Sequence, residues 1–131
     1  MDRAWSYQAS KHYMPQCGTM GSKDKETFET RLANLQKAFL KAENKLGDTQ
    51  FFKGDYISNV DIAWLPLLHR ASVIKDRSGF DMLEGFPKVQ AWQTALIKSG
   101  LTEKTVPQDF VEKFSGFYFT NTYLASLAEV H

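Results

Sequence analysis

The chain has 131 residues, a formal net charge of +1 and 43% hydrophobic residues. This length suits one domain over residues 1–131 with a proper hydrophobic core, and the charge excludes a dedicated nucleic-acid binder, which would carry a basic stripe. No apolar run reaches roughly 18 residues and no basic start precedes an apolar core, so the sequence predicts neither a membrane span nor a signal peptide. The one cysteine, Cys17, excludes an internal disulfide and favours the reducing cytoplasm.

The first helical pattern extends from residue 2 to about residue 16. Its amphipathic spacing is formed by Trp5, Ala9, His12 and Tyr13. Pro15, Gly18 and Gly21 then predict that the helix stops and that a loop follows.

A long second helix is predicted to follow Ser22, which can cap it, and to stop at Gly47. Its apolar residues lie on one narrow face, at Phe28, Leu32, Leu35, Phe39, Ala42 and Leu46. The rest of the helix is rich in Lys and Glu. This seam can pack within a helical bundle or against a coiled-coil partner, and the bundle is the favoured interpretation.

Residues 51–62 combine a Phe-x-x-Gly-Asp lead-in with the start of a third helix. Ser58 is suited to be its N-cap, and Asp61 can accept a hydrogen bond from the Ser58 amide and complement the helix dipole. Ile57 and Ile62 occupy the two positions of a hydrophobic staple. We assign these four residues a role in folding rather than in catalysis, since no His stands at a motif-like position beside Ser58 and Asp61.

The third helix is apolar nearly all round as far as Ala71, so it is predicted to be the buried centre of the domain. Pro66 removes one backbone donor inside this helix and predicts a bend. After a connector that contains Gly and Asp, Pro87 suits the first turn of a fourth helix, which Gly100 ends.

A last helix is predicted to open at residues 105–107, with Asp109 in its first turn. One of its faces is formed by Phe110, Phe114, Phe117, Asn121 and Leu124. No strand alternation competes with these patterns, so we predict an all-α bundle of about five helices.

Motifs from consecutive segments point to one family. They are the Ser58–Asp61 helix start with its lead-in, the Asp61-Ile62-Ala63 sequence with Pro66 and Arg70 behind it, and the pattern Phe86-Pro87-x-Val89-x-x-Trp92. With these motifs the chain resembles the C-terminal, all-helical domain of the soluble glutathione transferases of bacterial type. The resemblance implies a thioredoxin-like partner domain that binds glutathione and supplies the activating Ser, Tyr or Cys. We find no strand-helix-strand segment for that domain, so we expect this chain alone to be inactive and to hold no cofactor.

The resemblance also implies where a co-substrate would bind. In that family, the first helix of this domain forms one wall of the hydrophobic co-substrate site between the two domains, where small-molecule clefts are common. The first set of wall candidates is Trp5, Tyr7, Gln8, Lys11, His12 and Met14. The second set, on the last helix, is Phe117, Tyr118 and Phe119. The family further implies a homodimer in which the first two helices form much of the subunit contact.

Other chemistry is disfavoured. His12, His69 and His131 lie far apart and lack Cys or carboxylate neighbours at ligand spacing, so no metal site is predicted. Cys17 has no activating motif, so an inert thiol is favoured over a redox nucleophile.

Two functions follow from this sequence. The leading one is the C-terminal domain of a glutathione transferase-like protein, which forms the apolar wall for a hydrophobic small molecule and part of a dimer interface. The alternative is a stand-alone, non-catalytic interaction module of the same fold, for dimerisation or scaffolding. The seam from Phe28 to Leu46 gives this alternative some support.

Overall fold

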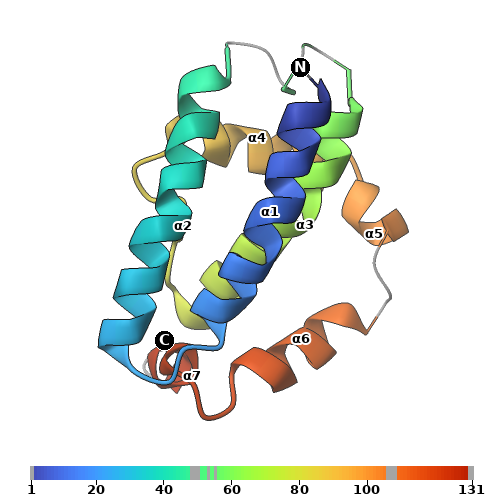
Figure 1. Ribbon diagram of the computed structural model, residues 1–131. Coiled ribbons are helices and arrows are strands. Elements are labelled where there is room, and N and C mark those ends of the chain that lie inside the picture. The colour runs from blue at the N-terminus through green and yellow to red at the C-terminus, as the bar shows by residue number, and fades with distance from the viewer. Residues whose placement is uncertain (1, 48–50, 53, 55, 106–108, 130–131) are drawn as a thin grey trace.

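The computed structural model describes residues 2–47, 51–52, 54, 56–105 and 109–129. Within those residues the chain forms seven helices and no strand (Figure 1). They are α1 (Asp2–Met20), α2 (Lys25–Lys45), α3 (Asn59–Ser78), α4 (Pro87–Lys98), α5 (Leu101–Thr105), α6 (Phe110–Tyr118) and α7 (Tyr123–Glu129). The predicted all-α bundle is therefore confirmed. The number of helices is larger than predicted because α5 is an additional short element and the predicted last helix is divided into α6 and α7.

Helix α1 is longer than its sequence pattern predicted. It continues through Pro15 to Met20, so the predicted end near residue 16 is wrong. Pro15 is exposed, and the residues that follow hold the last turn in place: Gln16, Thr19 and Met20 are fully buried. The Thr19 hydroxyl also donates to the Pro15 carbonyl at 2.8 Å. Burial of this turn outweighs the cost of the proline.

Helix α2 is capped by Asp24 and not by Ser22. The Thr27 amide donates to Asp24 Oδ1 at 2.7 Å, which satisfies one of the free amides of the first turn. Ser22 is buried, and its hydroxyl donates to the Gly18 carbonyl at 3.0 Å. Ser22 thus closes α1, and the predicted cap lies two residues too early. The helix ends at Lys45, two residues before Gly47.

The apolar seam of α2 belongs to the core of its own domain. All six seam residues are buried: Phe28, Leu32, Leu35, Phe39, Ala42 and Leu46. They join one continuous core with α1, α3 and α4. Figure 1 shows α1 and α2 side by side in the front layer, with α3 and α4 behind them. Packing within the bundle is confirmed, and the seam is not available to a coiled-coil partner.

Helix α3 is the centre of the domain, as predicted. Ten of its residues are buried, including Trp64, Leu68 and Ile74, while Pro66 within it faces solvent.

Helix α4 begins at Pro87, as predicted. The hydrogen-bond acceptor for its first amides is a side chain of α2. Glu43 Oε1 accepts from the amides of Lys88 and Val89 at 2.9 and 3.0 Å.

The single last helix that the sequence predicted is two helices in the structure. Helix α6 stops at Tyr118, and Asn121 turns the chain with a φ of 57° before α7 begins. Asp109 precedes α6 as its N-cap residue. Of the predicted opening at residues 105–107, Thr105 ends α5, while Val106 and Pro107 lie outside the described residues.

Candidate functional site

The start of α3 is built around the buried carboxylate of Asp61. Asp61 Oδ2 accepts from the Ser58 amide at 2.7 Å and from the Ser58 hydroxyl at 2.8 Å. Asp61 Oδ1 accepts from the Phe52 amide at 2.9 Å and from Trp92 Nε1 at 2.7 Å. Four donors from three segments therefore compensate the burial of this carboxylate. The group holds the lead-in loop, α3 and α4 together and leaves no place for a substrate.

The other two residues of this helix start are less buried. Ile57 and Ile62 are both exposed hydrophobic side chains, so their predicted role as a staple remains a prediction. The structure adds an aromatic layer that the local motif did not include. Trp64 packs against Trp92 with ring centroids 5.7 Å apart, and Phe52 lies 5.7 Å from Trp92. The helix start is thus closed by rings from three segments.

The candidates on α1 do not form one wall. Tyr7 and Met14, 67% and 70% exposed, share the outer face of the helix. Trp5 and His12 are half-buried and turn toward α2, and Lys11 is exposed. The side chain of Gln8 lies outside the described residues. The helical period therefore divides the first set of candidates between the outer face of α1 and the side that faces α2.

A cleft of about 450 Å³ opens between α1 and α2, toward the first turns of α3. It is lined by Trp5, His12, Ala38, Lys41, Asn44, Lys45 and Trp64. The ring centroid of Trp64 lies 6.1 Å from that of Trp5 and 6.3 Å from that of His12. The Trp64 indole N–H donates to the Trp5 carbonyl at 2.9 Å, which fixes the ring. Burial, with Lys11 and Lys41 nearby, lowers the pKa of His12.

The other side of α1 meets α3 and α6 around Arg70. Arg70 Nη2 donates to the Tyr13 hydroxyl at 3.0 Å, and the guanidinium lies 4.6 Å from the centroid of the Tyr13 ring. The guanidinium also lies 5.8 Å from the centroid of Phe110 on α6. Arg70 Nη1 is buried and has no hydrogen-bond partner among the described residues. One aromatic ring from each neighbouring helix thus faces the cation.

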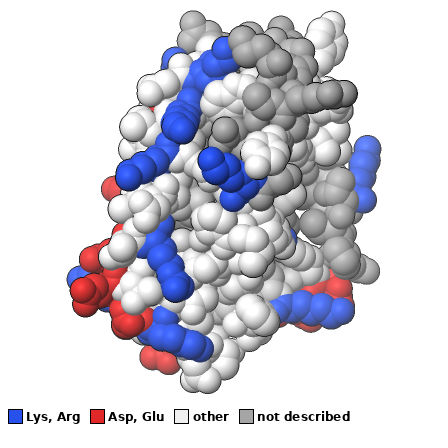
Figure 2. Space-filling model, in the orientation of Figure 1, with Lys and Arg blue, Asp and Glu red and all other residues white. Residues whose placement is uncertain are grey.

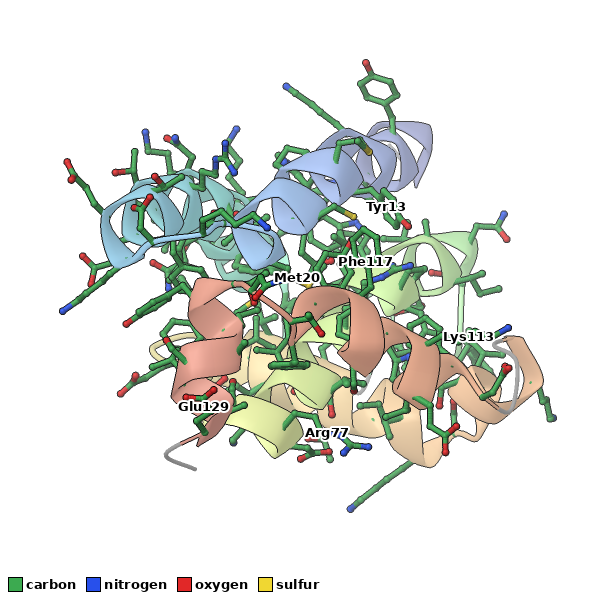
Figure 3. All side chains as sticks on the ribbon, turned by 90° about the horizontal axis from the view of Figure 1, so that it is seen from below. Tyr13, Met20, Arg77, Lys113, Phe117 and Glu129 are labelled. Carbon is green, nitrogen blue, oxygen red and sulfur yellow. The ribbon has the colours of Figure 1, made fainter. Side chains whose placement is uncertain are left out.

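The second set of candidates lies on this same side. Phe117 is 73% exposed, whereas Tyr118 and Phe119 are half-buried against the core. Burial and a hydrogen bond with Cys17 raise the pKa of Tyr118 to about 12, so its phenol is neutral at physiological pH. In Figure 3, Tyr13 on α1 and Phe117 on α6 lie in the space between the two ribbons.

A groove of about 330 Å³ continues from this region between α1 and α3. Its lining is mostly apolar and consists of Ala9, Tyr13, Ala63, Pro66 and Leu67. Pro66 and Leu67 stand one turn before Arg70 on α3. The groove and the aromatic rings around Arg70 therefore form one apolar surface with a single cationic group at its end.

The structure keeps His12 and His69 apart. His69 stacks on Phe110 with ring centroids 5.2 Å apart, while His12 lines the cleft on the other side of α1. His131 lies outside the described residues. Among the residues that the structure describes, no group of three His, Cys, Asp or Glu side chains is placed to hold a metal ion.

Several of these contacts were missed from the sequence. The sequence predicts for Tyr13 only a place on a helix face and for Arg70 only a family motif. It predicts no role for Lys41 and Lys45, which belong to the Lys- and Glu-rich part of the second helix. A signal for the first pair existed, because an Arg within a largely apolar helix needs partners. Lys41 and Lys45 gave no such signal, because only the crossing of α1 and α2 makes them line a cleft.

The arrangement defines a helical domain with two clefts along its first helix, and comparison with known families agrees with the helical fold. The family model described as glutathione S-transferase, C-terminal domain, matches residues 7–99. This match takes in nearly all of α1 and the whole of α2, α3 and α4, well over half of the chain. The chain belongs to this family. Helices α5, α6 and α7 lie beyond the matched residues.

Proposed function

We propose that this domain is the helical half of a glutathione transferase-like protein and forms the apolar wall of its co-substrate site. The observation that carries the proposal is the meeting of α1, α3 and α6 around Arg70. Tyr13 on α1 and Phe110 on α6 both face the guanidinium, which joins the three helices. The apolar groove between α1 and α3 extends this surface.

In this proposal the domain binds and orients an apolar, electrophilic small molecule and excludes water from it. Glutathione and the group that activates its thiol belong to a thioredoxin-like domain, which needs a sheet. The described residues of this chain contain helices and no strand. The phenol of Tyr118 stays protonated at physiological pH, so it cannot act as a base toward the co-substrate. The lone, free thiol of Cys17 supports a cytoplasmic location.

Two measurements test the wall. The isolated chain, incubated with glutathione and a chromogenic halonitrobenzene, should show no turnover above the buffer rate. A halonitrobenzene titrated against the labelled chain by NMR should shift signals of α1, α3 and α6. Phe117→Ser should weaken this binding, whereas Leu40→Ser, at a 50% exposed position on α2, should not. Turnover by the chain alone, or shifts confined to other helices, would contradict the proposal.

A homodimer through α1 and α2 is the second part of the proposal, and it is shared with the alternative of a non-catalytic interaction module. The buried seam of α2 gives it no support. Its support comes from Tyr7 and Met14, which leave a large apolar surface exposed on α1. Sedimentation equilibrium at micromolar concentration should report a dimer that Tyr7→Ser weakens and Phe117→Ser does not. A monomer for the parent chain would contradict both this interface and the alternative of an interaction module.

A further inference from the structure

A pocket of about 380 Å³ lies on the side of α3 that meets α4, α5 and α6, within the range of small-molecule sites of roughly 300–1,000 Å³. Figure 1 shows α5 and α6 on the side of α3 away from α2. Among the described residues, this pocket shares no lining residue with the groove between α1 and α3. One side is a stripe of α3 residues at three- and four-residue spacing, namely His69, Ser72, Val73, Asp76 and Arg77. The facing side consists of Ile97 of α4, Thr102 of α5 and Val111 of α6.

The lining combines aliphatic side chains with hydroxyl groups that the fold does not use. Val73 is buried, and Ile97 and Val111 are half-buried. The hydroxyls of Ser72 and Thr102 have no hydrogen-bond partner within the described part of the chain, although Thr102 is only 7% exposed. A ligand that carries both a branched aliphatic group and polar atoms can therefore use both parts of the lining.

Two opposite charges stand side by side in this pocket. Asp76 and Arg77 are consecutive and exposed, and neither forms an ion pair with another described residue. On the face in Figure 2 the charges are separated instead: Lys and Arg side chains follow α2 and lie over α1, while most acidic side chains gather toward the end where α1 turns into α2. Burial and Arg70 lower the pKa of His69, so its imidazole is neutral at physiological pH. The described lining thus offers one carboxylate and one guanidinium, with no net charge.

We propose that this pocket binds a small aliphatic zwitterion of the branched-chain α-amino acid type. Its ammonium group pairs with Asp76 and its carboxylate with Arg77, and its side chain lies against the aliphatic part of the lining. Each exposed ion pair adds little affinity, so selectivity comes from satisfying both charges at once. A ligand with only one charge leaves the other protein group without a partner. This site is independent of the proposed co-substrate wall.

The test is a set of three ligands with the same carbon skeleton. L-leucine carries both charges, L-leucinamide lacks the carboxylate, and 4-methylpentanoate lacks the ammonium group. Each is titrated at about pH 7, where the amines are largely protonated, into the methyl-labelled full chain. The NMR methyl signals of Val73, Ile97 and Val111 should shift, and those of Val60, at the start of α3, should not. L-leucine should bind at least about threefold more tightly than either analogue.

Charge-neutralising variants locate the two ends of the ligand. Arg77→Gln should remove the preference for L-leucine over L-leucinamide and preserve that over 4-methylpentanoate. Asp76→Asn should give the reverse pattern. The matched control is Glu26→Gln with Lys37→Gln, which neutralises one exposed charge of each sign on α2 and should preserve both preferences. The proposal is overturned if millimolar L-leucine leaves the pocket methyl signals unchanged. Equal affinities for the three ligands, or an equal loss in the control, would overturn it too.

Discussion

The start and the middle of α3 treat charged groups in opposite ways. Near its start, the Asp61 carboxylate accepts from four donors, the Ser58 amide and hydroxyl, the Phe52 amide and the Trp92 indole. In its second half, the Arg70 guanidinium has one hydrogen bond to Tyr13 and two aromatic neighbours. Its Nη1 remains buried without a partner among the described residues.

This difference separates folding from binding within one helix. A buried charge with every acceptor site in use is committed to the fold, because any change leaves donors unsatisfied. A half-buried cation with one buried, unused donor costs free energy in the empty protein and can recover it from a ligand. The start of α3 therefore belongs to stability, and its second half to the proposed co-substrate wall.

The largest effect is expected from Asp61→Ala. This change leaves the Trp92 indole and two backbone amides without their acceptor, and it should cost on the order of 3 kcal/mol or more. The urea midpoint measures it. Asp76→Ala, at an exposed position of the same helix, is the control and should change the midpoint little. If Asp61→Ala unfolds at the parent midpoint, the start of α3 does not govern stability and the comparison fails.

A smaller effect is expected from Ser58→Ala. The variant keeps the Ser58 amide bond to Asp61 and removes only the hydroxyl, so it should cost on the order of 1 kcal/mol. The same urea titration applies. A loss as large as that of Asp61→Ala would mean that the hydroxyl, and not the carboxylate, organises the helix start.

Acid should weaken the fold through the histidines. Burial and Arg70 lower the pKa of His69 below its ordinary value of 6.5, and burial with Lys11 and Lys41 lowers that of His12. Below pH 6.5 the unfolded chain therefore binds more protons than the folded one, so stability falls as the pH falls. The urea midpoint should drop between about pH 7.5 and pH 5.5, and His69→Gln should make this drop smaller. An unchanged drop in the urea midpoint would show that His69 does not contribute to the acid sensitivity.

The smallest effect is expected from Arg70→Met. Met preserves the apolar stem and removes a cation that lacks a full set of partners, so the free energy of unfolding should change by less than about 1 kcal/mol. The same variant should lower the affinity for a halonitrobenzene if the wall is correctly placed. A loss of stability close to that of Asp61→Ala would contradict the difference between the start and the middle of α3.

The local parts of this fold were predictable, and the long-range parts were not. The seam from Phe28 to Leu46 and the start of α3 depend on spacing within one segment, and both helices lie where their patterns predicted. The predictions based on Pro15 and Ser22 were wrong, because burial of the turn between α1 and α2 outweighs their local preferences. The family resemblance implied the candidates on α6. Their position relative to α1 depends on tertiary packing, which the sequence pattern does not reveal.

The cleft between α1 and α2 could not be predicted from sequence patterns, for a related reason. Lys41 and Lys45 face outward on α2 and look like any solvated pair. Their relation to Trp5 depends on where α1 crosses α2, which tertiary packing decides. The break at Asn121 was equally hidden, since the apolar spacing of residues 110–124 suits one continuous helix.

That break brings α7 back to the turn between α1 and α2. The Tyr123 amide donates to the Ser22 carbonyl at 2.9 Å, the Tyr123 ring packs on Phe28 with centroids 5.0 Å apart, and Leu124 is fully buried. These contacts close a loop that contains most of the polypeptide. The entropy lost in closing this loop is offset only when α7 and the turn between α1 and α2 are both folded. Helix α7 thus makes the completion of the core depend on a segment that comes after the other described helices in the chain.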